Sequence, residues 1–531
     1  EIFMIDKALL INRDSNIENQ NVLHINRLPP RATVVPATRA GVYYQNKYDS
    51  ALIRSLCIDF KFKYLTGDIF KDFYREEICD DGWDVIDVPS MWQYRGYGKP
   101  EYPNIRYPIP FLPPYVKKQN PVGLYRKSFN IDTPSGRTIL HFAGVDNAFY
   151  VYLNGEMVGF SKGSRVPAEF DVSDYIRAGE NLLAVKVFTY SDATYLENQD
   201  MLLASGIFRD VFLIQTEKNS LWDYRVKTSY SSISVELKLS VDTPYRVKIS
   251  LGGESAIYDA APELSHTFKI ENARLWTAET PNLYDLAIEL IGAAGVFEVH
   301  SKRVGIMHTR VEGNKFLVNE RPIYIKGINR HENNAWNGRT MTVEQIRRDL
   351  EMIKANNLNA VRLSHYPNDP ATYEIAAELG LYLMDEADLE THGAYISNGD
   401  QGYLSKSPEW LPAYVDRITR MIERDKNEVA IFIWSTGNEA GTGENLNKCI
   451  DIIREFDPTR ECIITQDIGE YTHFRKIAYY PMSRTEEYSD EGYPVLAIEY
   501  AHAMGNSPGD FKDYWDEIDG NIRFIGAYVW E

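Results

Sequence analysis

The 531-residue chain has few cysteines, no long apolar run and a minority of basic residues. Its four cysteines lack CxxC or metal-finger spacing, which in a chain this long argues against a disulfide framework and leads us to expect a reducing, cytoplasmic location. No apolar run reaches the roughly 18 residues of a membrane-spanning helix, and the first residues lack the basic stretch of a signal peptide. A net charge of −19 argues against nucleic acid or an anionic membrane as partner.

Aromatic residues, by contrast, are abundant, at 13% of the chain with 36 Tyr and 9 Trp. Flat rings stack on sugar faces, but large β-domains use aromatic residues as freely, so this composition leaves both interpretations open. The apolar fraction of 44% and the charged fraction of 25% are typical of a soluble globular protein. At roughly 150 residues per domain, the length predicts three or four domains.

Sequence periodicity divides the chain into an arm and three domains. Residues 1–40 have mixed polarity without a clear period, which predicts an extended N-terminal arm. Short alternating segments over 41–217 predict an antiparallel, sugar-binding-like jelly-roll β-sandwich. Within it, Asn154-Gly155 lies between two such segments and predicts a type I′ hairpin turn. Alternation continues over 218–306, a length that suits an immunoglobulin-like β-sandwich.

From 307 to 531 strand-like runs alternate with helical ones, which is typical of βα units. The expected strands are 322–328, 360–364, 381–385, 429–435, 462–466, 477–482, 494–499 and 524–530. The expected helices include 343–356, 370–379, 408–425, 442–456 and 508–518. Eight strands in about 210 residues predict a (β/α)8, or TIM, barrel. Because the last strand ends with the chain, we expect a barrel without its closing helix, completed by further chain or by a partner.

Two of the expected barrel strands end in glutamates. The apolar run that starts at Val429 leads to Glu439, and the run that starts at Pro494 leads to Glu499. Parallel barrels place their chemistry at the carboxyl ends of the strands, so these glutamates are the candidate catalytic pair, although a single strand-end glutamate would more often be structural. Without a Ser/His/Asp triad, a phosphate loop or Rossmann glycines, such a pair fits glycoside hydrolysis. One carboxyl would donate a proton while the other attacks or activates water.

Further polar residues fall at the same strand ends. Four histidines do so: His331, His365, His392 and His502. A single one would more often be structural, but four predict a polar pocket. Glu390 with His392 suits a divalent cation. Asn438 either offers its amide to a substrate or bonds its own backbone, and Trp530 is either a stacking platform or a barrel plug.

Seven segments carry a resemblance to a known family. Five lie in the barrel region: Gly327–Glu332, Asn359–Asn368, Asp385–Gly393, Ile433–Glu439 and Glu499–Asn506. Two lie in the first sandwich: Tyr195–Met201 and Ser205–Val211. Together they resemble the signatures of glycoside hydrolase family 2, specifically the lac-type bacterial β-galactosidases, and the match runs from about residue 15 to the end of the chain.

This resemblance implies a retaining β-galactosidase that hydrolyses lactose-like β-galactosides by double displacement, with some transfer to sugar acceptors. It implies Glu439 as acid/base and Glu499 as nucleophile. The alternatives are a β-glucuronidase or β-mannosidase of the same family, or a non-catalytic sugar-binding protein. The family also implies either a homo-oligomer or a large chain paired with a small chain.

The resemblance implies ligands for the remaining residues. Magnesium would be held by Glu390, His392 and Glu439, and sodium by Asp200 together with residues beyond the end of this chain. The residues matched to the family's sugar-binding positions are Asn104, Asp200, His331, His365, Asn438, which would contact the 2-hydroxyl, His502 and Trp530, the platform under the galactose. The family's tyrosine that bonds the nucleophile is replaced here by Ser483, which leaves Tyr479 or Tyr480 for that role.

Overall fold

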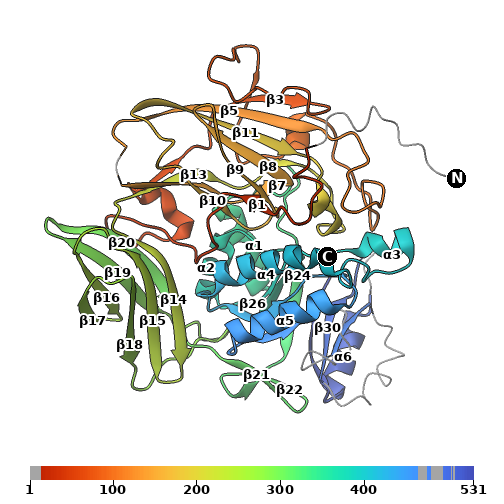
Figure 1. Cartoon of the computed structure of the whole chain (residues 1–531). Coiled ribbons are helices and arrows are strands. Elements are labelled where there is room, and N and C mark those ends of the chain that lie inside the picture. The colour runs from red at the N-terminus through yellow and green to blue at the C-terminus, as the bar shows by residue number, and fades with distance from the viewer. Residues whose placement is uncertain are drawn as a thin grey trace.

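Two β-sandwiches and a parallel barrel pack side by side in the computed structural model of the chain (Figure 1). The structure describes residues 14–134, 136–464, 475–479, 494–503, 505 and 509–530.

The first sandwich consists of a seven-stranded and a four-stranded antiparallel sheet. The larger sheet has the order β1 (His24–Ile25), β9 (Glu156–Lys162), β8 (Ala148–Leu153), β11 (Gly179–Phe188), β5 (Val122–Ile131), β3 (Phe60–Leu65) and β4 (Asp84–Ile86). The smaller has the order β10 (Ala168–Asp171), β6 (Arg137–Phe142), β13 (Val211–Thr216) and β2 (Ile53–Ser55), and β7 (Val145–Asp146) pairs with β12 (Gly206–Ile207). Alternate residues such as Phe62, Val151 and Phe170 face inward and bury one core between the sheets.

The predicted hairpin turn is present between β8 and β9. Asn154 and Gly155 have φ values of 51° and 82°, the left-handed pair that a type I′ turn requires. The Asn154 side chain also ties the turn to the neighbouring strand, because its Oδ1 accepts from the Leu182 amide at 2.8 Å. The turn prediction is confirmed.

The second sandwich is smaller and packs against the barrel. One sheet has the order β14 (Ser220–Ser229), β15 (Ser232–Ser240) and β18 (Glu263–Lys269). The other has the order β17 (Glu254–Asp259), β16 (Arg246–Leu251), β19 (Tyr284–Gly292) and β20 (Gly295–Val304). A short antiparallel sheet of β21 (Thr309–Glu312), β22 (Lys315–Val318) and β23 (Arg321–Pro322) then leads into the barrel.

The barrel sheet contains all eight predicted strands, and the pairs between neighbours are parallel. Their order is β28 (Glu461–Ile463), β27 (Ile431–Ser435), β26 (Tyr382–Glu386), β25 (Ala360–Leu363), β24 (Ile325–Arg330), β31 (Phe524–Val529), β30 (Val495–Tyr500) and β29 (Arg475–Ala478). Strands β25, β26, β27 and β30 are buried along their whole length, as expected of parallel strands covered on both faces. The predicted fold class of jelly-roll sandwich, immunoglobulin-like sandwich and TIM barrel is confirmed.

Among the described residues, six α-helices lie around the barrel: α1 (Val343–Ala355), α2 (Pro370–Leu379), α3 (His392–Asn398), α4 (Leu411–Asp425), α5 (Glu444–Phe456) and α6 (Phe511–Gly520). Short 3-10 helices are η2 (Tyr44–Asp49), η3 (Trp92–Arg95), η4 (Asp192–Tyr195) and η5 (Pro408–Trp410). Helix α3 was not predicted, and the predicted helix 408–425 begins instead with η5. None of the described helices is both long and apolar enough to cross a membrane.

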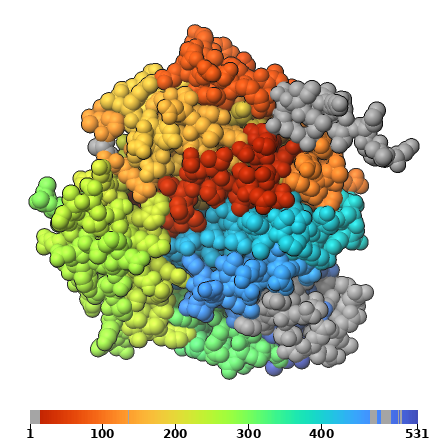
Figure 2. Space-filling model, in the orientation of Figure 1, coloured from red at the N-terminus to blue at the C-terminus, as the bar shows by residue number. Residues whose placement is uncertain are grey.

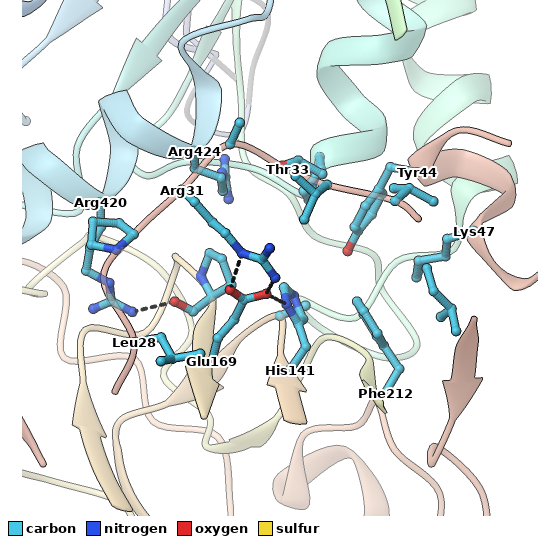
Figure 3. Close-up of a pocket in the computed structure, with 18 of the residues that line it drawn as sticks. Leu28, Arg31, Thr33, Tyr44, Lys47, His141, Glu169, Phe212, Arg420 and Arg424 are labelled. Atoms are coloured by element: carbon cyan, nitrogen blue, oxygen red, sulfur yellow. Dashed lines mark hydrogen bonds and ion pairs between the residues drawn. The ribbon is translucent and has the colours of Figure 1, made fainter. Parts of the chain in front are cut away.

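The described part of the N-terminal arm lies in the seam between the first sandwich and the barrel (Figure 2). Its backbone bonds to both, because the Leu28 amide donates to Glu169 and the Thr33 amide donates to Arg424. Arg31 of the arm pairs with Glu169 through two hydrogen bonds, of 2.7 and 3.0 Å, and Glu169 also contacts His141 at 2.9 Å (Figure 3). The cavity beside this cluster measures about 40 Å³, room for a few water molecules rather than a substrate.

Candidate active site

The two candidate catalytic glutamates face a common site at the carboxyl ends of the barrel strands. Glu499 is part of β30 and is buried, whereas Glu439 follows β27 and is half-exposed. The Tyr479 hydroxyl lies near both glutamates. Its burial raises its pKa well above the usual range, and Glu499 and, more weakly, Glu439 raise it further. The backbone of Tyr479 is fixed beside Glu499, because its amide donates to the Glu499 carbonyl at 2.8 Å. Tyr480 and Ser483 lie outside the described residues.

Arg362 of β25 holds Glu499 in place from inside the barrel. Its Nη1 donates to Glu499 Oε1 at 2.6 Å, and its Nη2 donates to Asn438 Oδ1 at 2.9 Å. Its Nε and Nη2 also form a two-point pair with Glu386, at 3.0 and 2.9 Å. Burial alone would lower the pKa of Arg362, but Glu386 and Glu499 outweigh it and raise that pKa, so the guanidinium stays charged. One buried cation therefore fixes both Glu499 and the side chain of Asn438.

Glu390, His392 and Glu439 form the predicted metal cluster. One ligand atom from each lies within 4.8 Å of the others, and His392 Nδ1 is 2.6 Å from Glu439 Oε2. Glu390 is fully buried, and neither of its side-chain oxygens has a hydrogen-bond partner of normal geometry among the described residues. Burial and the Glu439 carboxylate raise the pKa of Glu390 well above its ordinary value, and the Asn438 side chain only partly offsets this. A cation would satisfy these oxygens, so the residues fit a metal.

The aromatic and imidazole rings predicted to bind sugar form one cluster around Trp530. His365 stacks on Trp530 with ring centroids 5.1 Å apart and an angle of 9° between the planes. His331 and His502 lie edge-on to Trp530, at 5.7 and 6.3 Å. His365 is itself oriented by Glu386, which contacts its Nδ1 at 2.7 Å.

A loop of the first sandwich completes the edge of this site. The amide of Glu390 donates to Leu196 and the amide of Asn198 donates to Glu390, so the sandwich loop pairs with the backbone of a predicted metal ligand. Asp200, from the same loop, lines a hollow of about 370 Å³ together with His331, and its Oδ1 has no partner among the described residues. The structure does not bring Asn104 into this group: it is exposed, and its Oδ1 accepts from the next amide, that of Ile105, at 2.6 Å.

Sequence reasoning missed the residues that hold the site from behind, chiefly Arg362, Glu386, Asn329 and Tyr366. Arg362 had a readable signal, because a lone arginine inside a short apolar strand must find buried carboxylates. Asn329 had none: its Nδ2 donates to the Ile498 carbonyl at 2.9 Å, a contact across 169 positions that no local pattern predicts.

Three family models match the chain. The sugar binding domain of glycosyl hydrolases family 2 matches residues 62–217, a second model of glycosyl hydrolases family 2 matches 207–306, and the TIM barrel domain of the same family matches 309–531. Adjacent models of one family therefore cover most of the chain.

Curated relatives and solved structures agree with the family models. The chain is 36% identical to a β-galactosidase of Pectobacterium atrosepticum over 99% of this chain and 54% of that protein, and 36% identical to one of Enterobacter cloacae over 99% and 55%. It thus spans about half the length of the curated relatives it matches. A β-glucuronidase of Bacteroides uniformis covers 90% of this chain and 64% of its own, with a TM-score of 0.74 at 18% identity. One of Ruminococcus gnavus covers 90% of both, with a TM-score of 0.72 at 21% identity. At these identities the two structures show a shared fold.

Proposed function

The chain belongs to glycosyl hydrolase family 2, and from that premise we propose that it carries the active site of a retaining β-galactosidase. Its substrates would be lactose-like compounds with a terminal non-reducing β-D-galactosyl residue. The observation that carries the proposal is that Arg362 holds Glu499 in place and that both Glu499 and Glu439 lie near the Tyr479 hydroxyl. The choice of galactose rests on the 36% identity to β-galactosidases over nearly the whole chain.

In the first step Glu499 attacks the anomeric carbon of galactose as a carboxylate. Arg362 Nη1 donates to its Oε1, which fixes the direction of the carboxylate, and the Tyr479 hydroxyl would donate to it as well. Glu439 gives its proton to the departing glycosidic oxygen, so that the aglycone leaves as an alcohol. The product of this step is a galactosyl ester of Glu499.

In the second step Glu439, now a carboxylate, removes a proton from a water molecule that attacks the same carbon. The ester bond breaks, galactose leaves with its configuration retained, and Glu499 regains its charge. A sugar hydroxyl in place of water would give transfer to an acceptor. Trp530 would support the galactose ring while the histidines around it and Asn438 would contact its hydroxyls.

We propose Glu390, His392 and Glu439 as the ligands of a magnesium ion, because two carboxylates meet there and neither oxygen of the buried Glu390 has a hydrogen-bond partner among the described residues. When bound, magnesium would supply positive charge beside these carboxylates and would offset the burial of the Glu390 carboxylate. Asp200 is proposed to bind sodium through its unpartnered oxygen. The predicted cytoplasmic location, self-association and small partner chain stay predictions.

Replacement of the proposed nucleophile tests the activity. Glu499→Gln should lower turnover of an aryl β-galactoside by roughly 10⁴-fold or more, as losses of catalytic nucleophiles do elsewhere. Glu444→Gln, an exposed glutamate at the start of α5, is the matched control and should leave turnover unchanged. Aryl β-glucuronides and β-mannosides assayed beside the galactoside distinguish the related activities. Near-normal turnover by Glu499→Gln would refute the proposal.

Thermal unfolding tests the metal site without depending on activity. Added Mg²⁺ should raise the melting temperature of chelator-treated protein, because a ligand that binds only the folded state stabilises it. In Glu390→Gln the rise should disappear at the same Mg²⁺ concentration. An equal rise in both proteins would place magnesium elsewhere.

A further inference from the structure

Arg165 is a buried cation that the first sandwich places behind the sugar site. It follows β9, and only 1% of its surface is exposed. Its guanidinium lies between two aromatic rings, 4.4 Å from the centroid of Tyr366, which belongs to the barrel, and 5.0 Å from that of Phe208. Its nearest carboxylate, Asp146, is 3.7 Å away, and its Nε and Nη1 have no hydrogen-bond partner among the described residues. The face of the guanidinium is thus covered by the Tyr366 ring, and it forms no hydrogen-bonded ion pair at Nε or Nη1 within the described residues.

The Tyr366 hydroxyl links this cation to a residue of the sugar site. It lies 3.2 Å from Nδ1 of His331, and the Tyr366 side chain is buried. A neutral imidazole donates through one ring nitrogen and accepts through the other, so the direction of this one hydrogen bond fixes which nitrogen of His331 carries the proton.

The charges around His331 favour its neutral form. Burial lowers the pKa of His331 well below its ordinary value, and the nearby His365 and Arg165 lower it further. A guanidinium against the ring face withdraws electron density from the phenol, which makes its hydroxyl a better donor and a poorer acceptor. The favoured arrangement therefore has Tyr366 O–H donating to Nδ1, with the His331 proton on Nε2.

We propose that Arg165 is a positioning residue for sugar recognition: stacked on Tyr366, it directs the Tyr366 hydroxyl proton onto His331 Nδ1 and leaves His331 to offer Nε2–H to a galactose hydroxyl. His331 Nε2 is buried and has no hydrogen-bond partner in the described part of the chain. His331 borders the hollow of about 370 Å³ that Asp200 also lines, and its ring centroid lies 5.7 Å from that of Trp530. The identity of the sugar in this inference rests on the proposed function. The protonation state of the His331 imidazole does not depend on it.

The state of the imidazole can be measured first. Protein labelled with ¹⁵N in its histidine rings, with the His331 signals assigned by loss in His331→Gln, should show a neutral ring protonated at Nε2. Arg165→Met should shift that ring toward the other tautomer or a mixture, whereas Arg165→Lys should keep more of the Nε2–H form. A wild-type ring protonated at Nδ1, or at both nitrogens at neutral pH, would overturn the proposal whether or not the protein hydrolyses galactosides.

The role in recognition is tested with the four monodeoxy aryl β-galactosides. In the wild type one deoxy position should be penalised in kcat/KM because Nε2–H then lacks its acceptor. Tyr366→Phe, which keeps the ring over Arg165 but removes the hydroxyl, should reduce that penalty by about tenfold at this position alone. Arg165→Met should do the same at the same position, and Arg177→Met, an exposed sandwich arginine, should not.

A purely structural role gives a different pattern. It would lower kcat/KM for the parent and all four deoxy substrates by the same factor, so that every penalty stays at its wild-type value. That result in Tyr366→Phe would overturn the proposal even if Arg165→Met failed to fold. Absence of wild-type activity on every galactoside, together with the expected ring state, would count against the proposed function alone.

Discussion

The contact between Arg362 and Glu499 leads to a prediction about the two halves of the proposed reaction. In the first half the carboxylate loses its charge to become an ester, and in the second it regains that charge as a leaving group. A charge-assisted hydrogen bond from Arg362 Nη1, 2.6 Å long here, stabilises the carboxylate far more than the ester. Its loss should therefore slow the second half more than the first.

The magnitude follows from the bonds that Arg362→Lys would break. Lysine keeps the positive charge but cannot reach Glu386 at two points and Glu499 and Asn438 at once. A hydrogen bond to a charged group contributes about 1.5–3 kcal/mol. If that contribution is lost from the transition state of ester hydrolysis, the rate of that step falls by about 10- to 150-fold.

Rapid mixing with an aryl galactoside that has a good leaving group measures both halves. Arg362→Lys should release a burst of aryl alcohol, of about one equivalent per site, followed by slow turnover. Arg348→Lys, an exposed arginine on α1, is the matched control and should behave as the wild type. Circular dichroism confirms folding in each case. If Arg362→Lys turned over within twofold of the wild type, with the same burst and the same steady-state phase, the proposed role of Arg362 in stabilising the Glu499 carboxylate would be refuted.

Two further predictions concern Tyr479 and the seam cluster of Arg31, Glu169 and His141. Tyr479→Phe removes the hydroxyl that we propose donates to the Glu499 carboxylate, and should lower kcat by about 10- to 150-fold without changing the melting temperature; an unchanged kcat would assign Tyr479 no part in the reaction. Burial would raise the pKa of Glu169, but Arg31 and His141 outweigh it and hold that pKa well below its usual value. Its stabilising contribution is then complete above the unfolded-state pKa near 4.5 and is lost as the pH falls. Glu169→Gln should cost up to about 3–5 kcal/mol of unfolding free energy at pH 7, and this cost should shrink progressively as the pH falls from about 4.5 toward 2, measured by urea unfolding; a cost that stays constant over that range would contradict it.

The barrel could be predicted from sequence because its strands are short and apolar on both faces. The run from Val429 to Ser435 has no competing helical period, and β27 occupies Ile431–Ser435 within it. Strand ends were less exact, since the first predicted strand, 322–328, is observed at Ile325–Arg330, where two polar residues extend it. Helix α3 was missed because His392–Asn398 has no apolar stripe and is only seven residues long.

The residues of the candidate site likewise fall into those that the sequence could predict and those that it could not. Residues at strand ends, such as Glu439 and His365, were found because the barrel fold sends strand ends to one rim. Asn104 was placed in the pocket by resemblance alone, and its left-handed backbone with φ of 56° and its bond to the next amide match a turn asparagine. Arg165 and Tyr366 could not be found, because their contact joins two domains and depends on how the sandwich docks.

The contact between the first sandwich and the barrel makes the sandwich part of the candidate active site. The seam is held by buried ion pairs, such as Arg209 with Glu332 at 2.6 Å and Arg417 with Glu197 at 2.6 Å. A buried ion pair adds little net stability, but a buried charge without its partner is strongly destabilising. The two domains can therefore pack together in few relative positions. Since the sandwich loop also bonds the backbone of Glu390, an error in docking would displace a predicted metal ligand directly. The position of the site residues therefore depends on how accurately the first sandwich and the barrel are placed relative to each other.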